Sequence, residues 1–120
     1  LGAIVGRYAN RIANGTANIE GKIYYFDKNQ NKTHTLHGGS DGSAVRNWKI
    51  VQYNKSMVTF LDKLPDGHMG FPGNLTVETT YKVAQSTIDI VIEASTDKTT
   101  LCNFTNHSYF NLDVPKNIFR

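Results

Sequence analysis

The residues with the clearest capacity for chemistry lie at positions 103–112, where the chain reads Asn-Phe-Thr-Asn-His-Ser-Tyr-Phe-Asn-Leu. Successive side chains of a β-strand point to opposite faces, so a strand here would place five polar side chains on one face. Burying such groups without partners costs about 1 to 3 kcal/mol each, so we expect this face to meet a polar ligand or water. The five residues are Asn103, Thr105, His107, Tyr109 and Asn111.

Within this stretch His107 is the candidate for proton transfer. An imidazole has an unperturbed pKa of about 6.5, so it can give or take a proton near neutral pH. The competing interpretation is an edge strand with a wet outer face and a histidine without a catalytic role. These residues alone leave both interpretations open.

A second polar group, Asn10 and Arg11, follows Gly6 in a glycine-rich segment near the start of the chain. The guanidinium of Arg11 is a planar fork of donors suited to a hydroxyl-rich or carboxylate ligand, and Asn10 can both donate and accept. The segment lacks the GxGxxG and GxxxxGK[ST] spacings, so no nucleotide site is predicted. A structural salt bridge explains Arg11 equally well.

His37 comes directly before Gly38 and Gly39, where the backbone can approach a small molecule closely. This pattern favours a loop at a binding site over a core position. His34 lies three residues earlier, which is the spacing of a helical metal pair, but the glycines oppose a helix and no carboxylate accompanies the pair. We therefore expect neither a metal nor another cofactor.

Short strands and turns must position these groups. Tight polar turns separate three pairs of alternating segments, and each pair predicts an antiparallel hairpin. In the first hairpin Ile19, Ile23 and Tyr25 are the expected apolar contacts. The pairs are residues 16–19 with 22–26, 48–53 with 57–61, and 75–83 with 87–94.

A long loop at residues 64–73 contains Pro65 and Pro72 and is expected to be rigid. Phe71 at its tip either covers a pocket or pins the loop down. No segment reads as an amphipathic helix. The pattern therefore predicts an all-β fold, an antiparallel sandwich or barrel without an internal linker.

Composition narrows the class of protein. The 120 residues suit one domain, and the net charge of +3 comes from 13 scattered Lys and Arg residues, so no nucleic-acid partner is expected. No apolar run approaches the roughly 18 residues of a membrane helix, so no membrane partner is expected either. The single cysteine, Cys102, favours a reducing compartment, and we expect a cytoplasmic protein unless a signal peptide precedes Leu1.

Four sequence blocks stand out together: residues 6–15 (GRYANRIANG), 36–39 (LHGG), 66–67 (DG) with 70–75 (GFPGNL), and 105–112 (TNHSYFNL). Together they resemble the aldose 1-epimerase family, also called galactose mutarotase. The resemblance extends over nearly the whole chain and implies an antiparallel β-sandwich of the galactose mutarotase-like type that binds a free hexose. Because the chain starts at Leu1 and stops at Arg120, we expect residues 1–120 to be part of the catalytic domain, with N-terminal and C-terminal parts missing.

The resemblance also implies roles for individual residues. His107 would be the general acid that protonates the ring oxygen, and a glutamate late in the family's chains would be the base. His37 would bind the sugar near its ring oxygen, and the remaining implied sugar ligands are Asn10, Arg11, Ser108 and Tyr109.

The family's glutamate block is absent from the printed chain, so we expect this piece alone not to catalyse. No local carboxylate lies in a base motif of the family. One further departure is His68-Met69, where the family more often has acidic residues, which weakens any role for that loop in sugar contacts. The local carboxylates are Glu20, Asp27, Asp41, Asp62, Asp66, Glu78, Asp89, Glu93, Asp97 and Asp113.

Two other functions remain open. A lectin-like module could hold a sugar through Asn10, Arg11, His37 and Tyr109 without converting it. A hexose 6-phosphate epimerase would need a basic cluster for the phosphate, which the sequence does not assemble. A glycosidase is disfavoured because it needs two facing carboxylates.

Overall fold

The fold is all-β, and the computed structural model describes residues 2–112. Ten strands lie in this range, and every pair of neighbouring strands is antiparallel. The strands are β1 (Ile4–Val5), β2 (Arg11–Ile12), β3 (Thr16–Ile19), β4 (Lys22–Tyr25), β5 (Thr35–Leu36), β6 (Lys49–Tyr53), β7 (Met57–Leu64), β8 (Leu75–Ala84), β9 (Thr87–Thr96) and β10 (Thr105–Asn106). Three single 3₁₀ turns lie at Ala13–Gly15, Ser43–Val45 and His68–Gly70. None of the helical turns in residues 2–112 could cross a membrane.

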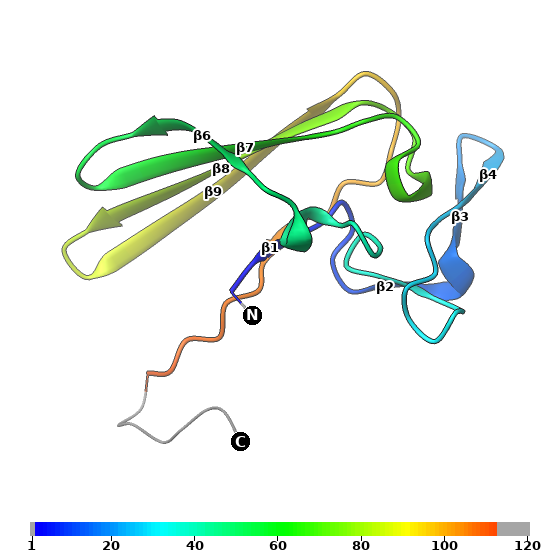
Figure 1. The fold of residues 1–120 in the computed structure, drawn as a ribbon, viewed down its shortest axis with the longest axis horizontal. Coiled ribbons are helices and arrows are strands. Elements are labelled where there is room, and N and C mark those ends of the chain that lie inside the picture. The colour runs from blue at the N-terminus through cyan, green and yellow to red at the C-terminus, as the bar shows by residue number, and fades with distance from the viewer. Residues whose placement is uncertain (1, 113–120) are drawn as a thin grey trace.

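The largest element is a sheet of four strands in the order β6-β7-β8-β9. Leu75, Val77 and Thr79 of β8 are buried, while the residues between them are only partly covered. This alternation is the period-two pattern of the sequence. The three predicted hairpins, β3–β4, β6–β7 and β8–β9, are confirmed by the antiparallel pairing of their strands. Figure 1 shows this sheet on one side of β1 and β2, with the β3–β4 hairpin on the other side.

Two small clusters of buried side chains form the core. One contains Ile12, Ile19, Phe26 and Phe71, with the rings of Phe26 and Phe71 stacked at 4.3 Å between centroids. The other joins Leu64, Leu75 and Val77 beneath the partly buried Trp48, Ile92 and Phe104. Phe71 is fully buried, so it pins the long loop to the core and does not cover a pocket.

Two expectations about local structure are wrong. Ile23 and Tyr25 are 49% and 71% exposed, so of the three expected apolar contacts of the first hairpin only Ile19 reaches the core. The segment 103–112 is not one long strand, since only Thr105–Asn106 pairs as β10 and Asn103 makes an isolated bridge with Tyr8. The alternation of that segment therefore holds over a few residues only, because β1 offers a partner of just two residues.

Arg7 ties the long loop to the N-terminal segment from inside the protein. Its side chain is buried, and its guanidinium donates four hydrogen bonds of 2.8 to 3.0 Å to the backbone carbonyls of Leu64, Pro65, Pro72 and Gly73. Burial lowers the pKa of Arg7 to about 10, so the group keeps its charge at neutral pH. The contacts of Arg7 are therefore structural.

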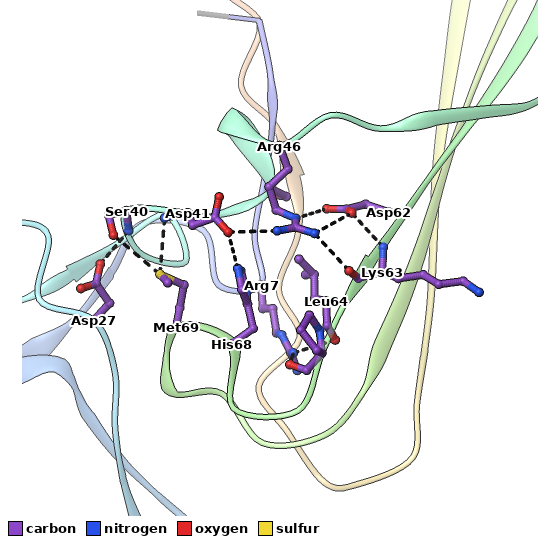
Figure 2. A network of polar contacts seen from close by, with 12 residues as sticks. Arg7, Asp27, Ser40, Asp41, Arg46, Asp62, Lys63, Leu64, His68 and Met69 are labelled. Carbon is purple, nitrogen blue, oxygen red and sulfur yellow. Dashed lines mark hydrogen bonds and ion pairs between the residues drawn. The ribbon is translucent and has the colours of Figure 1, made fainter.

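A network of polar contacts joins the loop after β5 to the loop after β7 (Figure 2). Asp41 Oδ2 accepts a hydrogen bond from Arg46 Nη1 at 2.9 Å and lies 2.8 Å from His68 Nε2, while Arg46 Nε donates to Asp62 at 2.7 Å. The contact with His68 and the contact with Arg46 lower the pKa of Asp41. His68 and Met69 thus hold the loop that follows His37, and Met69 Sδ accepts a hydrogen bond from the Asp41 N–H at 3.4 Å.

Candidate active site

Three segments far apart in the sequence meet because of two short strand pairs. In the β2–β5 pair Arg11 lies opposite Leu36, and in the β1–β10 pair Val5 lies opposite Thr105. A hydrogen bond of 2.8 Å from the Ala9 N–H to the Asn103 carbonyl then brings the two pairs together. The result is an open pocket of about 470 Å³ lined by Ala9, Asn10, Arg11, Leu36, His37, Thr105 and His107.

A backbone contact selects one tautomer of neutral His37. Its Nδ1 accepts a hydrogen bond from the Asn10 N–H at 3.0 Å, and the His37 N–H donates to the Asn10 carbonyl at 2.9 Å. An imidazole whose Nδ1 accepts carries its proton on Nε2 when neutral, so the ring can donate a hydrogen bond from Nε2. Gly38 is required next to it, because a Cβ there would collide with the Gly6 carbonyl.

His37 also lies beside other groups of positive or potentially positive charge. The rings of His37 and His107 are 5.1 Å apart between centroids, at an interplanar angle of 84°. Burial, His107 and Arg11, in that order of size, lower the pKa of His37 below its ordinary value of 6.5. His37 is therefore poised to act as a neutral donor near neutral pH.

The lowered pKa of His37 should make the stability of the protein depend on pH. Between the lowered value and 6.5 the folded chain binds fewer protons than the unfolded chain, so the contribution of His37 is present above pH 6.5 and is lost as pH falls through this window. We expect the excess free energy of unfolding of wild type over His37→Asn to shrink as pH falls through this window. Asparagine tolerates the positive φ of 52° at this position and does not titrate. Urea unfolding from about pH 7.5 to pH 5 measures it, and a difference independent of pH would contradict it.

Arg11 reaches the pocket with two side-chain partners. Its Nη1 donates to Asn10 Oδ1 at 3.0 Å and its Nε donates to Gln30 Oε1 at 2.6 Å. Arg11 makes no ion pair within residues 2–112, so the structural salt bridge proposed as its alternative role is not found there. Gln30 lies in an irregular polar segment, so no local pattern marked it as a contact of Arg11.

His107 is fixed through its backbone and its neighbours. Its N–H donates to the Ala3 carbonyl at 2.8 Å, while Asn106 Oδ1 accepts from the Ser108 N–H at 2.9 Å and Asn106 Nδ2 donates to the Tyr81 hydroxyl at 3.0 Å. The hydroxyl of Tyr81 thus links the large sheet to the turn that carries His107. Sequence reasoning missed this role of Tyr81, which read only as one residue of an alternating strand.

The other predicted site residues, Ser108 and Tyr109, are not among the residues that line the pocket. The rings of Tyr109 and His107 are 5.3 Å apart, and Tyr109 is 63% exposed. Ser108 does not line the pocket, and its Oγ lies near Gly2. No carboxylate of residues 2–112 lines the pocket, and Asp113 lies outside the described residues. The described range also contains no group of three or more His, Cys, Asp or Glu that could hold a metal ion.

Comparison with known proteins decides the family. The model of the aldose 1-epimerase family matches residues 1–120. The chain belongs to the aldose 1-epimerase family. It is 44% identical over 114 residues to an aldose 1-epimerase of Haemophilus influenzae, a match that covers 94% of this chain and 33% of that protein. It is also 43% identical over 112 residues to the galactose mutarotase of Mus musculus, covering 93% of this chain and 32% of that protein.

Solved structures agree with the aldose 1-epimerase assignment and with the all-β fold. A GalM/aldose epimerase homologue from C. elegans superimposes with a TM-score of 0.84 at 37% identity, covering 92% of this chain and 34% of that chain. Galactose 1-epimerase from Lactobacillus acidophilus gives a TM-score of 0.79 at 29% identity, with coverages of 91% and 33%. The chain spans about a third of the length of the curated relatives it matches.

Proposed function

We propose that the protein containing this chain is an aldose 1-epimerase, an isomerase that interconverts the α and β anomers of free hexoses such as galactose and glucose. The observation that carries the proposal is the pocket in which His107, His37 and Arg11 face one ligand-sized space. Residues 1–120 are proposed to form part of the catalytic domain. Cytoplasmic location is a further proposal, supported only by Cys102, which is free.

His107 is proposed as the general acid. It protonates the ring oxygen of the sugar while a carboxylate base removes the proton of the anomeric hydroxyl. The ring opens to the aldehyde, the C1–C2 bond rotates, and closure delivers the hydroxyl to either face of the ring. Acting together, acid and base avoid an unstable ion, and each contributes roughly 10²–10⁴-fold to the rate.

The remaining residues are proposed to bind the sugar. Arg11 and Asn10 donate to and accept from ring hydroxyls, and His37 donates from Nε2 because its Nδ1 is already occupied by the Asn10 N–H. Tyr109 packs beside His107 as an aromatic wall, and Ser108 lies between these two residues in the chain. No step in this scheme requires a metal or another cofactor.

Polarimetry tests the proposal directly. The protein expressed from its complete reading frame should accelerate the mutarotation of α-galactose or α-glucose, and the 120-residue chain alone should not. The physical reason is that no carboxylate in residues 2–112 lines the pocket, so these residues offer an acid without a base. Acceleration by the 120-residue chain would contradict this prediction, and no acceleration by the longer protein would favour a sugar-binding module.

A phosphorylated substrate is less well supported. Among the described residues that line the pocket, Arg11 is the one side chain with a permanent positive charge. A phosphate group is usually held by several donors or by a cluster of basic residues. Free hexose therefore remains the proposed substrate class.

A further inference from the structure

Gln30 contacts the guanidinium of Arg11 from a different part of the chain. Gln30 Oε1 accepts a hydrogen bond from Arg11 Nε at 2.6 Å, across 19 residues of sequence. The other partner of the guanidinium, Asn10 Oδ1, belongs to the adjacent residue and moves with the same backbone. Gln30 is therefore the contact that fixes the plane of the guanidinium relative to the rest of the pocket.

The backbone around Gln30 is itself fixed. The Gln30 carbonyl accepts hydrogen bonds of 3.0 Å from the N–H groups of Thr33 and His34, and the Gln30 N–H donates to the His34 carbonyl at 3.1 Å. The side chain of the preceding residue, Asn29, pairs with both backbone groups of Leu36 at 2.7 and 2.9 Å. Since Leu36 lies opposite Arg11 in the β2–β5 pair, the loop that holds Gln30 is docked on the strands that carry Arg11.

Arg11 needs such support because its residue is exposed and its side chain is long and flexible. A guanidinium held at Nε and Nη1 keeps its remaining donors in one plane, so less freedom is lost when a ligand binds. The amide of Gln30 is neutral, so it orients Arg11 without cancelling the positive charge that the pocket presents.

We propose that Gln30 is a positioning residue that holds Arg11 in place for a sugar hydroxyl. This inference rests on the proposed function, because the ligand of Arg11 is the hexose. It assigns Gln30 to ground-state binding and not to proton transfer, since Gln30 touches Arg11 and does not line the pocket.

The test compares Gln30→Met, which keeps the length but loses the acceptor, with Gln30→Glu, which keeps an acceptor oxygen. In the protein expressed from its complete reading frame, Gln30→Met should raise the KM for galactose about five- to tenfold and leave kcat within about twofold. Gln30→Glu should recover much of that loss. Gln52→Met, an exposed glutamine on β6, is the matched control and should change neither constant.

A double mutant and a spectroscopic measurement separate the possible failures. In an Arg11→Ala background, Gln30→Met should cause no additional loss, and an additional loss would overturn the positioning role. Exchange of the Arg11 Nε–H with water, followed by NMR without sugar, should be faster in Gln30→Met and unchanged in Gln30→Glu. If the wild-type protein binds no hexose, the proposed function fails, while this exchange rate still decides whether Gln30 orders Arg11. Equal exchange in wild type and Gln30→Met would overturn the inference.

Discussion

Replacing His107 with glutamine in the protein expressed from its complete reading frame is expected to lower kcat for mutarotation by about 10²–10⁴-fold. Glutamine keeps hydrogen-bonding capacity but cannot transfer a proton to the ring oxygen. The affinity for hexose should change by less than about threefold, because an interaction made only in the transition state affects kcat and not ground-state binding. Polarimetry for kcat and calorimetry for the Kd of galactose measure the two quantities separately.

His34 offers a matched control for this substitution. Its Nδ1 accepts a hydrogen bond from the Asn14 N–H at 3.0 Å, which repeats the contact between His37 and Asn10, yet His34 does not line the pocket. His34→Gln should therefore leave kcat nearly unchanged. If His107→Gln weakened affinity alone and left kcat intact, the protein would be better described as a sugar-binding module.

Replacing Arg7 with methionine is expected to lower the free energy of unfolding by about 3–5 kcal/mol. Methionine fills part of the space but leaves four carbonyls, those of Leu64, Pro65, Pro72 and Gly73, without their donor. A loss of this size is a large share of the roughly 5–15 kcal/mol that stabilises a typical domain. Urea unfolding followed by tryptophan fluorescence measures the change.

Arg11→Met is the control, since it removes the same charge four residues away from an exposed position. We expect it to change the free energy of unfolding by less than about 1 kcal/mol, because surface substitutions of this kind are usually small in effect. Arg7→Lys should fall between the two, because an ammonium keeps the charge but cannot span four carbonyls with a planar fork. Equal losses for Arg7→Met and Arg11→Met would contradict the structural role of Arg7.

Elements that depend on neighbouring residues were predictable from the order of the amino acids. The hairpins β3–β4, β6–β7 and β8–β9 were predictable because alternation of apolar and polar residues is encoded within each strand and a few turn residues join the strands. The stretch at 103–112 did not form the predicted long strand, because a strand also needs a partner of matching length. Its alternation was present, but only β1 was available to pair with it, over two residues.

Which polar residues share a site depends on contacts between segments that are distant in the sequence. Arg7 and Arg11 look alike in sequence, yet one is buried under the long loop and the other faces the pocket. The proximity of His37 and His107, 5.1 Å apart between ring centroids, and the contact of Gln30 with Arg11 have no signature in local composition. Local patterns encode which face of a strand is buried, whereas the meeting of distant segments depends on the short β1–β10 and β2–β5 pairs, which are too brief to leave a pattern.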